Sequence, residues 1–272
     1  MRFWLTMGLL LVTLPAQALE LSGAFTQGGL VVGQVEPGAA VTLDGAALDV
    51  AANGAFVFGF GRDAGPKARL EVTGPDGRRA ARELSVAAQT YEVQRIDGLP
   101  ARKVTPAPED VARIKADNAK IWAVRGTSTP ETRFLSGFTW PVTGPISGVF
   151  GSQRILNGKP KNPHNGVDVA APIGTPIVAP AAGVVVLVHD DMFYTGKTVM
   201  IDHGLGLTSV YAHMDAISVV DGQVVEPGAP IGAVGKTGRV TGAHLHWGLT
   251  WKGVHLDPKL AAGEMAQAQV KN

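Results

Sequence analysis

Several residue types that would anchor or cross-link this 272-residue chain are absent or scarce. It contains no cysteine, so we expect neither a disulfide nor a lipid-anchored cysteine, and stability must come from burial of apolar surface. Only 17% of the residues are charged, with 24 Lys and Arg against 23 Asp and Glu. A chain so close to neutrality, with no block of basic residues, lacks the charge pattern of a protein that binds nucleic acid or anionic membranes.

Long apolar runs are also missing, apart from a short one at the start of the chain. The sequence begins MRFWLTMGLLLVTLPAQA, with one arginine, an apolar run from Leu5 to Leu14, and then Ala16-Gln-Ala18. This order is typical of a secretory signal peptide, residues 1–18, cleaved after Ala18. An N-terminal membrane anchor is the alternative, but the run is shorter than the roughly 20 apolar residues that a spanning helix needs. We therefore expect an exported protein with no stable membrane insertion after cleavage.

Glycine and proline are abundant instead, at 35 and 18 residues, which favours short strands and tight turns. Between residues 19 and 90, turn dipeptides such as Asn53-Gly54 and Asp76-Gly77 separate short apolar or alternating runs. Strands interrupted about every 8–12 residues by such dipeptides are typical of a small β-sandwich. This segment contains no histidine and its acids are scattered among turns, so we expect an accessory unit without catalytic residues. The runs are LVVGQV (30–35), AVTL (40–43), AFVFGF (55–60) and ARLEV (68–72).

Residues 91–137 are expected to form a linker that contains one helix. Prolines and acidic residues open the stretch DVARIKADNAKIWAV, which suits a helix beginning near residue 108 and ending near 125. The apolar residues at helical spacing predict that one face packs against a β unit. They are Val111, Ile114, Ile121 and Trp122.

From residue 138 to about 260 the pattern returns to short Val- and Ile-rich runs bounded by glycine or proline, such as GVVVLV (183–188) and TVMIDH (198–203). No helical period appears, so we expect a compact antiparallel β unit over 138–260, followed by a tail, 261–272. The predicted fold class is therefore mainly β: a small N-terminal β-sandwich, a connector helix and a C-terminal antiparallel β unit.

All the histidines lie in this second β unit, and two motifs are informative. In HNGVD, glycine and nearby prolines argue against a helix, so His164 and Asp168 should converge where a loop feeds a strand. An imidazole and a carboxylate are both good Zn²⁺ ligands, although H-x-x-x-D alone is a weak motif. In AHLHWGL, strand alternation places His244 and His246 on one face, as partners in a site or as two solvated surface residues. The seven are His164, His189, His203, His213, His244, His246 and His255.

His213, in SVYAHMD, also lies on a strand-like segment, and by parity we expect Tyr211 to line the same face. On its own, this histidine would be interpreted as half-buried and structural. Combined, however, the chain offers more metal-binding groups than a structural site needs. A catalytic zinc takes three protein ligands and leaves a position open, and the two remaining imidazoles can act as general base and oxyanion donor. The set is His164, Asp168, His213, His244 and His246.

The sequence resembles the lysostaphin-type (LytM-like) zinc metallopeptidases, which cut peptide bonds in peptidoglycan. The resemblance covers about 120 residues, from WPVTG (140–144) to LDP (256–258), and includes HNGVD, GLTSVYAHM, GQVVEPGAPIGAVGKTGRVTG and AHLHWGL in the family's order. It implies an antiparallel β groove with Zn²⁺ at its floor, bound by His164, Asp168 and His246. His213 and His244 would be the catalytic pair, with their division of labour left open. No other cofactor is implied.

The implied activity is hydrolysis of peptide cross-links by a zinc metalloendopeptidase in a bacterial periplasm. The bond that the resemblance implies is D-Ala–meso-diaminopimelate, with Gly-Gly as the alternative. Peptidoglycan stem peptides are then the partner, and the N-terminal unit is expected to position the groove, cover it or bind a regulatory protein. One alternative is a non-catalytic wall-binding module or activator, but none of the five positions is substituted.

A biotinyl or lipoyl carrier is a third interpretation, but it would need an exposed lysine, and Lys197 lacks the flanking residues. The other histidines receive lesser roles. We expect His203 to be structural at a β-turn, His189 to lie in a loop, and His255 to be similar to His189. Asp190 and Asp191 could be considered a hard-cation site, but adjacent carboxylates normally face opposite ways.

Overall fold

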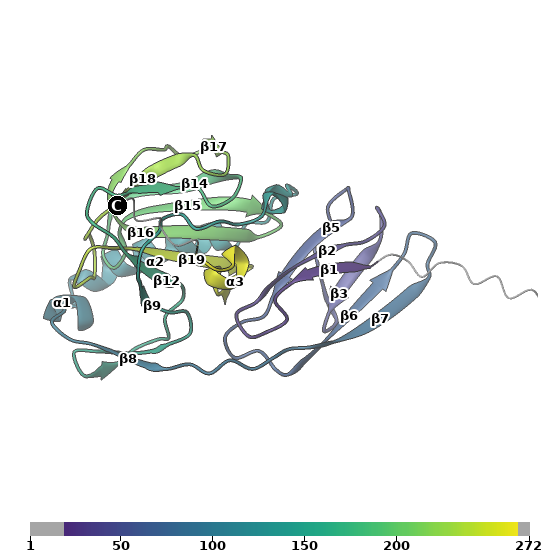
Figure 1. The fold of residues 1–272 in the computed structure, drawn as a ribbon, viewed down its shortest axis with the longest axis horizontal. Coiled ribbons are helices and arrows are strands. Elements are labelled where there is room, and N and C mark those ends of the chain that lie inside the picture. Colours follow the sequence, from purple (N-terminus) through teal and green to yellow (C-terminus); the bar gives the residue numbers. More distant parts are fainter. Residues whose placement is uncertain (1–18, 266–272) are drawn as a thin grey trace, which may run out of the picture.

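The first β unit is a sandwich of two antiparallel sheets in a computed structural model that describes residues 19–265 (Figure 1). The expected signal peptide lies outside the described residues, as does most of the expected tail. One sheet has the order β1-β2-β5 and the other β4-β3-β6-β7. The strands are β1 Glu20–Gly23, β2 Leu30–Gln34, β3 Ala40–Leu43, β4 Ala46–Ala47, β5 Ala55–Gly59, β6 Lys67–Thr73 and β7 Arg79–Ser85.

Aromatic and aliphatic side chains fill the space between these two sheets. In β6, alternate residues are buried and exposed, which is the pattern of a strand with one face on a core and one in water. Phe56 and Phe58 of β5 are fully buried, with ring centroids 6.1 Å apart. A Cβ on Gly33 of β2 would lie 2.1 Å from the Phe56 ring, so this position has no room for a side chain.

The second β unit is built on one large sheet, and the predicted fold class, mainly β with antiparallel sheets, is confirmed. Its main path runs β17-β14-β15-β16-β19-β12-β9, and β13, β18 and β20 pair beside it. The strands are β9 Ile146–Gly148, β12 Val167–Ala170, β13 Pro176–Val178, β14 Gly183–Met192, β15 Gly196–Gly204, β16 Leu207–Ile217, β17 Val224–Val225, β18 Pro230–Val234, β19 His244–Trp251 and β20 Val254–Leu256. A short helix, α3 Pro258–Ala262, follows.

The segment between the two units contains more than the predicted helix. It holds β8 Val93–Ile96, the one-turn helix α1 Ala101–Val104, the long helix α2 Asp110–Arg125 and a 3₁₀ turn, η1 Arg133–Ser136. Strand β8, which the sequence did not predict, pairs in parallel with β10 (Gln153–Leu156), and β10 pairs with β11 (Lys159–Pro160). The linker thus supports a hairpin of the second β unit.

Helix α2 packs on β14 and β16, but the prediction of which apolar residues face the sheet is partly wrong. Ile121 packs against the buried side chains of these strands, whereas Trp122 is 56% exposed and Val111 is 42% exposed. Polar contacts complete the docking, because buried Asp117 accepts a 2.7 Å hydrogen bond from the amide of Phe193. Among the described residues, no helix has the length and apolar character needed to cross a membrane.

The two β units share a hydrophobic core. Leu30 and Val57 of the sandwich pack in one buried cluster with Leu207, Leu249 and Leu256 of the large sheet. The approach is close, since a Cβ on Gly59 would lie 2.5 Å from Leu256. Figure 1 shows the sandwich to the side of the large sheet. Along β19 this contact lies about 10 Å or more from the two histidines that begin the strand, at about 3.4 Å per residue.

His203 is a structural histidine, but it lies within strand β15 and not at a β-turn. Its side chain is fully buried, with Nδ1 2.7 Å from the Ala182 carbonyl and Nε2 2.8 Å from the Ser209 hydroxyl. Because a carbonyl only accepts, Nδ1–H donates to it and neutral Nε2 accepts from the hydroxyl. Burial lowers the pKa of His203 to about 4.

This histidine predicts a loss of stability in acid. In the unfolded chain this histidine binds a proton below about pH 6.5, whereas in the folded chain it does so only near about pH 4. The free energy of unfolding therefore holds the full contribution of His203 above about pH 6.5 and decreases by about 2 kcal/mol by pH 5. Urea unfolding across this range should show a steeper loss in the wild type than in His203→Asn. His189→Asn serves as the control. Equal pH dependence in the wild type and His203→Asn would contradict this.

Candidate metal centre and active site

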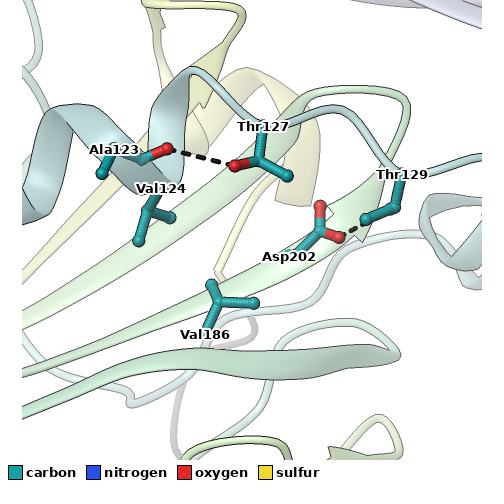
Figure 2. A pocket seen from close by; sticks show the side chains of 6 residues that line it. All are labelled: Ala123, Val124, Thr127, Thr129, Val186 and Asp202. Atoms are coloured by element: carbon teal, nitrogen blue, oxygen red, sulfur yellow. Dashed lines mark hydrogen bonds between the residues drawn. The ribbon is translucent and has the colours of Figure 1, made fainter.

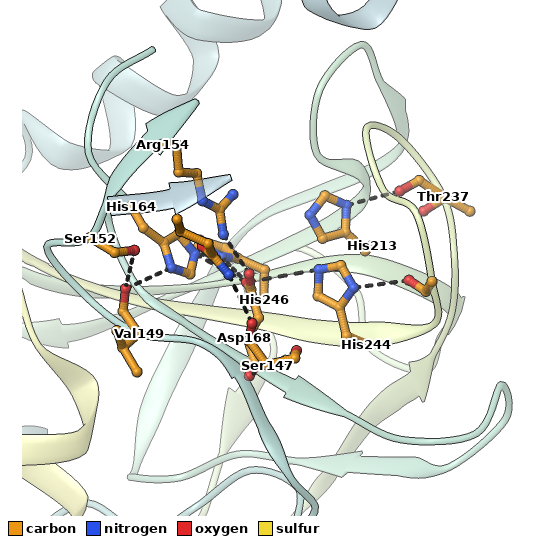
Figure 3. A network of polar contacts seen from close by, with 12 residues as sticks. Ser147, Val149, Ser152, Arg154, His164, Asp168, His213, Thr237, His244 and His246 are labelled. Atoms are coloured by element: carbon orange, nitrogen blue, oxygen red, sulfur yellow. Dashed lines mark hydrogen bonds and ion pairs between the residues drawn. The ribbon is translucent and has the colours of Figure 1, made fainter. Parts of the chain in front are cut away.

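Three side chains form a compact triangle of metal-binding atoms (Figure 3). His164 Nε2 lies 3.1 Å from Asp168 Oδ1, His246 Nδ1 lies 2.8 Å from the same oxygen, and the two nitrogens are 3.0 Å apart. The sheet register explains two of the three positions, because Asp168 on β12 is directly opposite His246 on β19. His164 comes from the loop that leads into β12, as the sequence predicted for this segment.

The triangle fits a zinc ion by its size and by the chemistry of its atoms. Tetrahedral bonds of about 2.0–2.1 Å require ligand atoms about 3.3 Å apart, which is close to the observed separations. Burial lowers the pKa of His164 to about 4, so the imidazole is neutral and able to ligate near pH 7. Burial acts to raise the pKa of Asp168, but His164 and His246 hold it well below its ordinary value. The donors are therefore two imidazoles and one carboxylate.

Backbone and arginine contacts hold these groups in place. His164 Nδ1 lies 3.1 Å from the Val149 carbonyl, so Nδ1–H donates there and Nε2 keeps its lone pair for a metal. Arg154, on β10, donates from Nη2 to Asp168 Oδ2 at 2.5 Å, while Oδ1 faces the triangle. Sequence reasoning missed Arg154, because its contact depends on the β8–β10–β11 hairpin and no local pattern indicates it.

His213 and His244 lie beside the triangle as a pair. Their ring centroids are 4.9 Å apart, and the His213 ring is 6.1 Å from that of His246. Each Nδ1 is 2.9 Å from a backbone carbonyl, of Thr237 for His213 and of Gly242 for His244. Those carbonyls fix the Nδ1–H tautomer, which leaves both Nε2 atoms unprotonated, and the one on His244 lies 3.8 Å from Asp168 Oδ1. Burial lowers the pKa of both side chains.

A β-bulge aims His213 at the site and moves Tyr211 away from it. Between the pairs Lys197–Met214 and Val199–Tyr211, one residue of β15 is opposite two of β16, and His213, one of those two, has a positive φ of 65°. The expectation that Tyr211 lines the same face is therefore wrong: its side chain is fully buried in the core, and its hydroxyl pairs with Ser209. Parity fails because the extra residue reverses the alternation of side chains.

Comparison with known proteins agrees with this geometry. The sequence profile described as Peptidase family M23 matches residues 162–258. The crystal structure of a putative peptidase M23 from Pseudomonas aeruginosa is 32% identical, with a TM-score of 0.66, covering 88% of this chain and 96% of that one. The chain belongs to peptidase family M23. The predicted resemblance to lysostaphin-type (LytM-like) peptidases is thereby confirmed.

Two curated bacterial relatives match about two fifths of this M23 chain. Peptidoglycan DD-endopeptidase ShyA of Vibrio cholerae is 43% identical over 109 residues, which are 40% of this chain and 25% of that protein. DD-carboxypeptidase/endopeptidase Mpg of Neisseria meningitidis is 43% identical over 108 residues, 39% of this chain and 25% of that protein. The chain thus spans about a quarter of the length of each of these relatives.

Two glycines leave room for the M23 triangle. A Cβ on Gly148 would lie 2.4 Å from Asp168 Oδ2, and one on Gly166 would lie 2.9 Å from Cε1 of His246 and 2.4 Å from the Trp247 carbonyl oxygen. Neither glycine has a positive φ, so close approach and not backbone conformation requires them. The sequence contains both, but only the packing shows why they are glycine.

Gly148→Ala is therefore expected to displace the Asp168 carboxylate and to weaken zinc binding about 10- to 100-fold, the usual cost of disturbing a group that supports a ligand. Competition with a fluorescent zinc chelator measures the change. Gly65→Ala is the control, since its Cβ would meet nothing within 4 Å. Unchanged zinc affinity in Gly148→Ala would show that Asp168 is free to move without consequence.

The remaining candidates lie outside the triangle. His189 is in strand β14, which corrects its predicted loop position, and His255 is in β20, 3.4 Å from the Thr250 hydroxyl. Asp191 pairs with Arg113 of α2 at 2.7 Å, which argues against a hard-cation site there. Lys197 donates from Nζ to the Asp215 carbonyl and is not the free tip that a carrier requires.

A separate pocket lies between the end of α2 and strands β14 and β15 (Figure 2). Its volume is about 260 Å³, and its lining is mostly apolar. Its one carboxylate, on Asp202, accepts a 2.6 Å hydrogen bond from the Thr129 hydroxyl. None of the five predicted site residues lines this pocket.

Proposed function

We propose that this chain is a zinc-dependent endopeptidase that hydrolyses peptide cross-links of bacterial peptidoglycan. The observation that carries the proposal is one centre with three ligand atoms 2.8–3.1 Å apart and two further imidazoles whose rings are 4.9 Å apart. Membership of family M23 and the names of the curated relatives support it.

His164, Asp168 and His246 would hold the metal. A bound Zn²⁺ supplies Lewis acidity at the scissile carbonyl and lowers the pKa of a bound water toward about 7. His213 and His244 present unprotonated Nε2 atoms, so one would accept a proton from the attacking water. The other would take up a proton from solvent at Nε2 as negative charge develops beside it, and would then donate that N–H to the oxyanion. The backbone carbonyls at their Nδ1 atoms keep both rings oriented.

The bond cut is proposed to be D-Ala–meso-diaminopimelate, with Gly-Gly as the alternative. The name DD-endopeptidase of the Vibrio cholerae relative supports the first of these. Its bacterial source, together with the signal-like start of this chain, supports a periplasmic location. We also propose residues 19–90, 91–137 and 138–260 as the functional units. A regulatory protein that acts through the first unit stays a prediction.

Activity should fall in acid, and the midpoint of this fall in the pH–rate profile should lie below the ordinary imidazole pKa. Burial lowers the pKa of His213 and His244, and it lowers that of His164 to about 4, so all three are neutral at pH 7 and gain protons below the ordinary imidazole pKa. We expect cleavage to persist to about pH 6 and to disappear, together with bound zinc, near about pH 4. Rate and zinc content measured across this range test the prediction. A fall centred on about pH 6.5 with zinc still bound would contradict it.

The proposed function is tested with purified sacculi. The exported protein should contain about one zinc per chain and release soluble fragments. A chelator should stop the release and added Zn²⁺ should restore it. A wall-binding module or activator would release nothing under any of these conditions, and that result would overturn the proposal.

A further inference from the structure

Arg239 lies in the loop that joins β18 to β19, and this loop is tightly packed beside the site. Its guanidinium carbon is 4.5 Å from the centroid of the Tyr194 ring, and its amide donates to the Tyr194 carbonyl at 2.9 Å. A Cβ on Gly238 would lie 2.4 Å from that same carbonyl oxygen. Arg239 is therefore packed against the turn between β14 and β15, through its backbone amide and through its guanidinium.

The same loop frames the two catalytic candidates. It begins at Gly235, which forms a β-bridge with His244, and the Thr237 carbonyl orients His213 at 2.9 Å. The turn that carries Tyr194 also supports His213, whose amide donates to the Thr195 carbonyl at 2.8 Å. Arg239 thus lies in a loop that contacts both catalytic candidates, two residues beyond the carbonyl that fixes the His213 ring.

The charge of Arg239 has no protein partner in the part of the chain that the structure describes. Its side chain is half-buried, and the groups that influence it are Tyr194 and a second cation, Arg154, with no carboxylate among them. Burial lowers the pKa of Arg239, because a half-buried site stabilises the charged guanidinium less than water does. Arg154 is already committed to Asp168. A half-buried, pre-oriented guanidinium without a partner is well suited to bind a carboxylate from outside.

We propose that Arg239 binds the substrate carboxylate carried by the carbon that is bonded to the scissile nitrogen. This rests on the proposed function and narrows its substrate. In a D-Ala–meso-diaminopimelate cross-link that carbon bears a free carboxylate, and in a stem ending in D-Ala–D-Ala it bears the terminal one. An internal Gly-Gly bond offers no carboxylate at this place. Arg239 therefore selects for the first two bonds and against the third.

The test uses matched synthetic peptides and the full exported protein loaded with zinc. A cross-linked D-Ala–diaminopimelate dimer and a D-Ala–D-Ala stem are each prepared with the relevant carboxylate and with its neutral carboxamide. The variants are Arg239→Gln, Arg239→Lys and, as a control that removes a charge from an exposed position in the same loop, Lys236→Gln. The measurements are kcat and KM for each peptide, together with zinc content. Comparing the dimer with the stem shows which of the two sources is used.

We expect the wild type and Lys236→Gln to prefer the carboxylate by about 10- to 100-fold in kcat/KM, the usual value of a hydrogen-bonded charge. Arg239→Gln should lose that preference while cleaving the carboxamide as the wild type does and keeping its zinc. Arg239→Lys should recover part of it, because lysine lacks the planar fork.

Other outcomes separate this inference from the function beneath it. If the wild type cleaves both forms equally, or if Arg239→Gln keeps the preference, the inference is wrong and the proposed function stands. Loss of zinc, or an equal loss on both forms, in Arg239→Gln would assign the residue a structural role and overturn the inference. If the wild type cleaves neither the peptides nor the sacculi, the inference about Arg239 and the proposed function are both wrong.

Discussion

His246→Ala is expected to abolish zinc binding and to lower the rate of cross-link cleavage by about 10³-fold or more. The residue supplies one of three ligand atoms, and its Nδ1 is 2.8 Å from Asp168 Oδ1 and 3.0 Å from His164 Nε2. Two ligands do not hold Zn²⁺ at a catalytic site, and a metal supplies several kcal/mol of transition-state stabilisation. Elemental analysis of the purified variant and its rate on sacculi measure the two effects.

The matched control is His189→Ala, which removes an imidazole from strand β14 and leaves the triangle intact. It should keep both zinc and activity. Circular dichroism should show that His246→Ala is folded, because its ring is only partly buried and lies on the opposite face from Leu245 and Trp247, which form the core. Release of peptidoglycan fragments by a zinc-free His246→Ala protein would disprove the ligand assignment.

His213→Ala is expected to lower kcat by about 10²- to 10⁴-fold while the protein keeps its zinc, the range typical of a lost general base or acid. The structure separates His213 from the ligands, because it lies outside the group of three donors and its Nδ1 is used by the Thr237 carbonyl. Its Nε2 is therefore available for proton transfer. Zinc content and steady-state rates on the cross-linked dimer are the measurements.

The variant His244→Ala and the double variant refine this assignment. Both imidazoles act on one reacting group, so the double variant should be little slower than the slower single variant, as expected for residues that work as a unit. Loss of zinc in His213→Ala would make the residue a ligand, and an unchanged kcat would remove it from the mechanism.

Local patterns in the sequence were sufficient where one strand determines the geometry. Alternation in AHLHWGL places His244 and His246 on one face and buries Leu245 and Trp247, and the structure shows this arrangement. The same rule failed for Tyr211, because a bulge of one residue reverses the alternation and the sequence carries no separate mark for it.

Contacts between distant segments account for the other differences. Arg154 reaches Asp168 because β10 pairs with β8, a strand that lies far upstream and has no strong strand pattern. Helix α2 was predicted from its start signals, but a buried carboxylate, Asp117, contributes to its docking as well as the apolar stripe. Pattern arguments describe one element at a time, whereas these contacts exist only once two elements have met.

The first β unit, predicted as an accessory unit, shares buried contacts and an ion pair with the large sheet. Leu30 and Val57 share a buried cluster with Leu249 and Leu256, and Asp49 pairs with Lys252 at 3.0 Å. These contacts lie toward the opposite end of β19 from His244 and His246. In this arrangement the first unit packs against the side of the large sheet.

The most direct test of the central claim is the mass of the fragments that the zinc-loaded protein releases from purified sacculi. We predict conversion of cross-linked dimers to monomers, each event adding one water at a D-Ala–diaminopimelate bond and leaving the glycan strands intact. His246→Ala should release none of these products. Intact dimers accompanied by new sugar ends, or no release by the zinc-loaded wild type, would contradict the account.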